Sequence, residues 1–213
     1  MARALKVSGW VLMTLLAAFV TIVSLRYFIL RPEVAAAEPL REKFAAHLPI
    51  FLLHVLGGTV ALLLGPWQFW TRLRDGRLSL HRWLGRVYLS AILVGGAAGL
   101  YMAAIAFGGL PTQLGFGGLA VMWLATALLA YRRVRQGDYE AHREWMIRNY
   151  ALTFAAVTLR LWLPLFMLLG FSFVTAYTIV AWLSWVPNLL VVELYIGGKK
   201  AKKKPAAVGE YAV

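Results

Sequence analysis

The chain contains RLRDGRLSLHR at residues 72–82 and RVRQGDYEAHR at residues 133–143. Both segments fit the pattern R-x-R-x-G-x-x-x-x-H-R without a gap, and they lie 61 residues apart. Each segment follows one long apolar block and precedes another. Since an arginine-rich turn between two apolar blocks is typical of a helical hairpin in a membrane, the repeat predicts two tandem hairpins of the same orientation.

Six apolar blocks account for most of the sequence. Hydrophobic residues make up 61% of the 213 residues and charged residues only 15%, whereas a soluble domain carries roughly 25% charged residues. Each block is long enough to cross a ~30 Å hydrocarbon core as a tilted helix. The blocks cover residues 8–30, 47–71, 81–107, 113–132, 144–170 and 172–196. We therefore predict an all-α polytopic membrane protein with six transmembrane helices.

The repeat also predicts how the spans are grouped. Spans two to five, at about residues 47–170, are expected to form a central four-helix bundle from the two hairpins, with the first and sixth spans packed outside it. The six-helix domain covers residues 1–198, and residues 199–213 form a basic tail. The first span is longer than the apolar part of a usual signal peptide, so we expect a membrane helix rather than a cleaved segment at residues 1–37.

The basic residues predict the orientation of the chain. Seventeen of the 22 lysines and arginines lie near the N-terminus, in the two repeated turns or in the tail. The positive-inside rule then places both termini and both turns in the cytoplasm. The net charge of +13 is therefore expected to face membrane lipids and not nucleic acid.

The absence of cysteine excludes disulfides and thiolate-bound metals, which leaves histidine as the main candidate ligand. His81 and His142 occupy matching positions in the repeat, and arginines accompany both. Two facing imidazoles within a basic collar suit a b-type haem, with the imidazoles as axial ligands and arginines near the propionates. The collar residues are Arg82, Arg86, Arg143 and Arg148. The alternative is that these residues only bind lipid phosphate and fix helix depth.

His54 and Arg160 are the ionisable residues placed deepest in the apolar blocks. Such groups are uncommon inside a membrane and usually face protein or a cavity. Counting ~1.5 Å per residue puts both at a similar depth. We predict that they line one polar cavity, open to the outside, that binds an anionic or carbonyl-bearing ligand. Met122 is a possible second haem ligand for His54. The alternative is that Arg160 caps helix carbonyls near Pro164 while His54 bonds a neighbouring backbone group.

Three segments carry a resemblance to known proteins. They are HRWLGRVY at residues 81–88, HREWMIRNYALTFAAVTLR at residues 142–160, and the stretch from His54 to Phe69. The sequence resembles a bacterial family of predicted multi-pass membrane proteins of unknown function, which implies a bacterial inner-membrane location. More distantly, it resembles the di-haem cytochrome b superfamily, which includes ascorbate and ferric reductases. Span four lacks the histidine of that pattern, so the resemblance implies at most one haem.

The sequence therefore favours membrane electron transfer through haem b, with quinone as the exchange partner. His81 and His142, or His54 with another ligand, would bind the haem. An accessory or assembly subunit of a larger membrane complex that binds lipid remains the main alternative. A small transporter is a weaker one, because no acidic residue lies deep in a span.

Overall fold

The computed structural model describes residues 2–30 and 32–203, in which all regular secondary structure is helical. Six helical stretches are long and apolar enough to cross a membrane. They cover Val7–Ile29, Leu48–Gln68, Leu78–Ala104, Leu110–Arg135, Tyr139–Leu168 and Phe173–Ala201. They coincide with the six apolar blocks. The prediction of an all-α protein with six membrane-spanning helices is confirmed.

Three spans are single helices and three are broken. The single helices are α5 (Leu48–Gln68), α7 (Leu78–Ala104) and α8 (Leu110–Arg135). The broken spans are α1 with α2 (Ala2–Ser24, Arg26–Ile29), α9 with α10 (Tyr139–Thr153, Ala155–Leu168) and α11 with α12 (Phe173–Leu183, Val186–Lys203). Short helices α3 (Pro32–Ala35) and α4 (Glu38–Ala46) connect spans one and two, and α6 (Thr71–Gly76) connects spans two and three.

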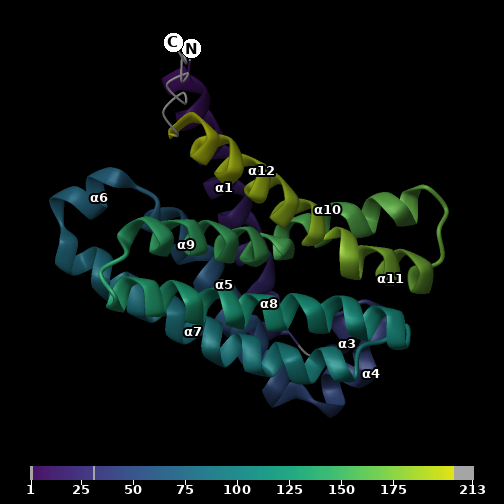
Figure 1. The fold of residues 1–213 in the computed structure, drawn as a ribbon. Helices are drawn as coiled ribbons and strands as arrows, with labels where there is room; N and C mark the ends of the chain where they lie inside the picture. The colour runs from purple at the N-terminus through teal and green to yellow at the C-terminus, as the bar shows by residue number, and fades with distance from the viewer. Residues whose placement is uncertain (1, 31, 204–213) are drawn as a thin grey trace, which may run out of the picture.

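The two repeated turns lie at the same end of the molecule, on the left of Figure 1. We call it the turn end; the opposite end, with α3, α4 and the α10–α11 connection, is the far end. Trp10 of α1 contacts Trp67 at the turn end of α5, and Lys200 of α12 donates to Glu144 of α9. The described beginning and end of the chain therefore lie at the turn end. The first residues of the predicted tail continue α12, and residues 204–213 lie outside the described residues.

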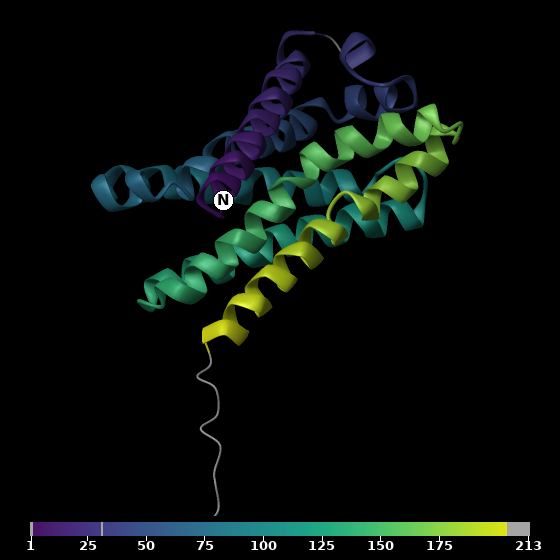
Figure 2. The ribbon, with the colours of Figure 1, turned by 90° about the horizontal axis from the view of Figure 1, so that it is seen from above.

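Each hairpin is closely packed, and the hairpins meet along one side. α7 packs along both α5 and α8, and α9 packs along α8 and α12. The fourth neighbouring pair, α5 and α9, touches over a short stretch, where the Tyr150 hydroxyl donates to the Leu62 carbonyl. Figure 2 shows α1 crossing the other spans obliquely. This arrangement leaves the α5–α9 side less tightly packed than the α7–α8 side.

Glycines permit the closest contact of the fold, between α5 and α7. A Cβ atom added to Gly95 would lie 2.9 Å from Gly57 Cα, and one added to Gly57 would meet the carbonyl oxygen of Ala91. Both glycines are buried. Small residues at such crossings let helix backbones approach within van der Waals contact, which drives helix association in lipid.

A buried polar cluster joins the two hairpins. The Tyr88 hydroxyl of α7 donates to Asn149 Oδ1 of α9 at 2.7 Å, and it lies 3.2 Å from Thr153 Oγ1. The Asn149 amide donates to the Trp123 carbonyl and to Thr126 Oγ1 of α8. Tyr88 and Asn149 are 61 residues apart, the same offset as the repeated turns. A pseudo-twofold axis along the membrane normal would bring such equivalent positions together.

The two repeated turns differ in detail. Gly137 has φ +77° directly after α8, as a glycine that ends a helix often does. The matching residue Gly76 does not play this role, because it is the last residue of α6 and does not have a positive φ. Span two ends at Gln68, soon after Pro66, and the turn is long enough to form a further helix.

Spans five and six each contain a proline and an interruption. Pro187 lies just after the break at Ser184–Trp185, where the Ser184 carbonyl accepts from Thr158 and Asn188. A break at this place fits the proline, which cannot donate to the preceding turn. In span five, Pro164 lies inside α10, and the interruption is at Phe154.

The orientation of the fold remains a prediction, which single cysteines test because the chain has none. Gly76→Cys and Gln136→Cys place a thiol at the turn end, and Leu110→Cys places one at the far end. We expect an impermeant maleimide to label only Leu110→Cys in intact cells, and to label all three after permeabilisation. Labelling of the two turn-end cysteines in intact cells would reverse the topology.

The α5–α7 contact predicts opposite effects of one substitution at adjacent positions. Gly57→Ala should lower the free energy of unfolding by about 1–3 kcal/mol, because its Cβ overlaps the α7 backbone. Gly58→Ala is the matched control, since its Cβ meets nothing within 4 Å and alanine favours a helix. Thermal unfolding in detergent measures both. Equal melting temperatures for the two variants would contradict this packing.

Candidate functional site

A cavity of about 430 Å³ lies at the far end, between α5 and α10. Residues from α1, α2, α4, α7, α8, α9 and α11 also line it. It forms where α10 leaves α5 and packs on α1 and α11 instead. Its volume is within the ~300–1,000 Å³ range of small-molecule sites. It is large enough for one small ligand.

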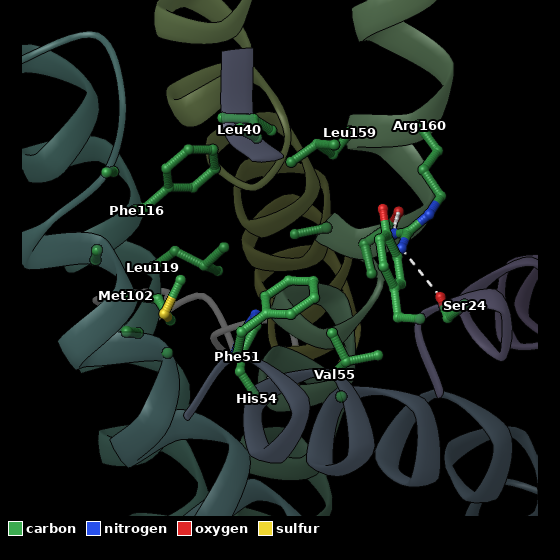
Figure 3. Close-up of a pocket in the computed structure, with 18 of the residues that line it drawn as sticks. Ser24, Leu40, Phe51, His54, Val55, Met102, Phe116, Leu119, Leu159 and Arg160 are labelled. Atoms are coloured by element: carbon green, nitrogen blue, oxygen red, sulfur yellow. Dashed lines mark hydrogen bonds between the residues drawn. The ribbon is translucent and has the colours of Figure 1, made fainter. Parts of the chain in front are cut away.

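His54 and Arg160 both line this cavity. Figure 3 labels them on different helices, α5 and α10, on either side of the space. The prediction that the two residues line one cavity is confirmed, but most of the lining is apolar and not polar as predicted. What the cavity binds is a separate question.

His54 is held in one orientation by the backbone of α7. Its Nδ1 lies 2.9 Å from the Gly95 carbonyl oxygen. Since a carbonyl only accepts, Nδ1 carries the proton, and Nε2 of the neutral ring is left as an acceptor. The ring lies directly over Gly99, where an added Cβ would be 2.6 Å from Nδ1. Among the described residues, none makes a hydrogen bond with Nε2.

Arg160 is fixed by two hydrogen bonds and keeps donors to spare. Nη1 donates to the Ala156 carbonyl at 2.9 Å and Nη2 to Ser24 Oγ of α1 at 3.0 Å (Figure 3). A guanidinium has five N–H donors, so most of its donors are not used by these bonds. The predicted alternative roles are thus also present: Arg160 bonds a helix carbonyl and His54 bonds a backbone group. These bonds leave His54 Nε2 and the remaining N–H donors of Arg160 without a hydrogen-bond partner among the described residues.

The rest of the lining is mainly apolar. Phe51, Val55, Leu119 and Leu159 surround the space (Figure 3). Met102 of α7 also lines it, whereas the predicted second ligand, Met122, does not. Sequence reasoning missed Met102 because its depth near the end of span three gave no hint of its neighbours. An apolar wall with few polar groups is the usual composition of a small-molecule site.

The charged side chains of the described lining are all cationic, and His54 adds an imidazole. Arg26 and Lys43 join His54 and Arg160, and no aspartate or glutamate side chain that the structure describes lines the cavity. Lys43 Nζ donates to the Ile105 carbonyl at 2.6 Å, which ties α4 to the end of α7. The cavity therefore carries positive charge without a described carboxylate to balance it.

His81 and His142 lie at the turn end and do not line this cavity. His142 Nδ1 lies 2.9 Å from the Ala130 carbonyl oxygen, which fixes the ring as His54 is fixed. His81 Nδ1 is buried without a hydrogen-bond partner among the described residues. That His81 and His142 bind one haem as axial ligands remains a prediction.

The arginines of the predicted basic collar differ in their surroundings. Arg82, Arg86 and Arg143 are exposed. Arg148 is engaged in ion pairs with Glu193 and, at 3.8 Å, with Glu144. The bidentate bond from Arg148 to Glu193 joins α9 to α12, so this guanidinium stabilises the packing of these two helices. In the turn itself, the neighbouring Arg74 guanidinium lowers the pKa of the Asp75 carboxyl.

Within the described residues, no group of three or more His, Asp or Glu side chains could hold a metal ion. A metal site built from protein ligands alone is therefore not found in that part of the chain. A haem is different, because its iron needs only one or two protein ligands.

Comparison with known proteins supplies a family. Residues 51–196 match the family described as "Predicted membrane protein (DUF2306)". The chain belongs to the DUF2306 family. The match covers the helices that line the cavity, apart from α1, α2 and α4. No curated protein and no solved structure matches the chain. The DUF2306 match agrees with the resemblance to a multi-pass membrane family, and it assigns no activity.

Proposed function

We propose that this DUF2306 protein is a membrane-embedded binding protein that holds one amphiphilic ligand in the far-end cavity. The ligand's apolar body would lie among the spans, and an oxygen-bearing head would lie at His54 and Arg160. The observation that carries this proposal is the convergence of these two side chains in one apolar cavity, each with unused hydrogen-bonding groups.

A quinone or quinol is the first member of this class to consider. A quinol hydroxyl can donate to His54 Nε2, and a second oxygen can accept from the spare donors of Arg160. Both bonds would form away from bulk water, where hydrogen bonds to charged groups are strongest. Electron exchange with the quinone would need a second redox group, such as a haem held by His81 and His142; with that group the protein would be an electron carrier of a bacterial inner membrane.

Substitution of the two polar residues tests ligand binding. His54→Ala and Arg160→Leu should each weaken binding of a short-chain quinone roughly 10-fold or more, as expected for loss of about 1.5–3 kcal/mol per hydrogen bond to a polar or charged group. Calorimetry in detergent measures the affinity, and solvent extraction with mass spectrometry identifies any ligand that copurifies.

His47→Ala is the matched control. His47 also lies towards the far end, where its Nδ1 is 3.1 Å from the Tyr101 hydroxyl, but it does not line the cavity. The His47→Ala variant should bind quinone with the same affinity as the parent protein. If all three variants lose stability alike and bind alike, His54 and Arg160 are structural. The accessory-subunit interpretation, with lipid or a larger membrane complex as the partner, would then be favoured.

Haem b in the same cavity is a second candidate, favoured by the hydrogen bond from His54 Nδ1 to Gly95. Haem-binding and metal-binding histidines commonly donate their other nitrogen to such a carbonyl, which leaves Nε2 as the ligand. Arg160 would then face a propionate, and Met102 is a candidate second ligand. The haem would supply one-electron chemistry.

An absorption spectrum of the purified protein decides between the haem sites. A reduced-minus-oxidised spectrum with b-type bands that is lost in His54→Ala, but kept in His81→Ala and His142→Ala, would place haem at the far end. The opposite pattern would favour the repeat-based pair. Absence of haem bands from protein expressed with ample haem would remove both haem proposals and leave the amphiphile site standing.

A further inference from the structure

We infer that the far-end cavity selects an amphiphile with a single negative charge on its head, of the long-chain carboxylate class. This inference rests on the proposed function, because it names the head group of the ligand that the cavity would hold, and it favours a carboxylate over the neutral quinone head considered above. It follows from the charges of the lining, from the state of Arg160 and from the size of the space.

Arg160 lacks a counter-ion. No carboxylate forms an ion pair with it in the part of the chain that the structure describes, and its two hydrogen bonds go to neutral oxygens. A cation placed among apolar spans without a counter-ion is energetically unfavourable. An anion that enters the cavity would offset this penalty, whereas a neutral head would only accept a hydrogen bond.

The other charges of the lining act in the same direction. Arg26 is exposed and lies over the Tyr27 ring, 5.0 Å from its centroid, and Lys43 lies on α4 near the end of α7. Together with Arg160 they give the cavity a positive potential that raises the local concentration of anions. Described acidic side chains do not line the cavity, so this potential is not cancelled within the lining.

The charge and the hydrogen-bond donors of one guanidinium match a carboxylate better than a phosphate. Of the two arginines in the described lining, Arg26 is exposed and Arg160 is not, so Arg160 is the guanidinium that an enclosed head group would meet. A guanidinium pairs bidentately with one carboxylate. A phosphate monoester carries up to two charges and more acceptor oxygens, so one guanidinium would leave part of its charge and some of its oxygens unpaired. The volume of about 430 Å³ suits one acyl chain with its head and is small for a two-chain phospholipid.

The test compares three single-chain ligands of equal length on the full chain in non-ionic detergent at pH 8. They are dodecanoate, dodecan-1-ol and dodecyl phosphate, each titrated by calorimetry. We expect dodecanoate to bind at least about 10-fold more tightly than the alcohol, in line with a charge-assisted bond worth ~1.5–3 kcal/mol. Tighter binding of the phosphate than of the carboxylate would overturn the carboxylate class.

Two substitutions at Arg160 separate charge from folding. Arg160→Gln should reduce dodecanoate affinity to that of the alcohol, while Arg160→Lys should retain part of the preference. Arg41→Gln is the control for overall charge, since Arg41 lies on α4 at the same end and does not line the cavity. It should keep the parent's preference, and thermal unfolding shows whether each variant is folded.

The outcomes distinguish the two proposals. If the alcohol and the carboxylate bind the parent equally, or if the folded Arg160→Gln variant keeps the preference, the anion inference is wrong and the amphiphile site remains. If none of the three ligands nor a quinone binds saturably, the proposed function itself is wrong.

Discussion

Polar groups between membrane spans must find their partners within the protein, because the hydrocarbon layer offers none. The cluster around Tyr88 and Asn149 meets this requirement: its hydroxyls and amide bond one another and nearby carbonyls. Its members are buried, and it joins α7, α8 and α9 near the centre of the fold. The far-end cavity is the contrasting case, since Nε2 of His54 and most donors of Arg160 are left for something that is not part of the described chain. The satisfied cluster joins the hairpins, whereas the cavity brings together two side chains that keep free hydrogen-bonding groups.

Packing explains why the unsatisfied groups lie where they do. Gly57 and Gly95 bring α5 and α7 into backbone contact, which closes one side of each span against its neighbour. On the other side, Tyr150 inserts between α9 and α5: its ring fills the place where a Cβ on Gly65 would lie. Beyond that ring, span five is interrupted at Phe154 and α10 packs on α1 and α11. The space left between α5 and α10 is the cavity.

Sequence reasoning identified the features that depend on composition and depth. Spans, turns and the shared depth of His54 and Arg160 follow from hydropathy and from ~1.5 Å per residue along a helix. Features that depend on side-to-side contact were missed. Met102 lines the cavity, although Met122 was the expected ligand. The interruption of span five lies at Phe154, where the sequence has no proline. The Tyr88–Asn149 bond had a signal in the sequence, because these residues are separated by the 61-residue offset of the turns.

The same offset shows how a repeated sequence can build a single cavity. It matches Gly99 with Arg160 and His54 with Gly115, so each hairpin has one bulky polar residue and one glycine at this depth. In the first hairpin the His54 ring lies over Gly99. In the second, Ala181 and Trp182 of α11 occupy the space beside Gly115, and Arg160 instead reaches Ser24 of α1. Because α1 and α11 belong to the outer spans, which the repeat does not include, these spans break the symmetry. They turn Arg160 towards the same space as His54, so that the two polar residues meet in one site.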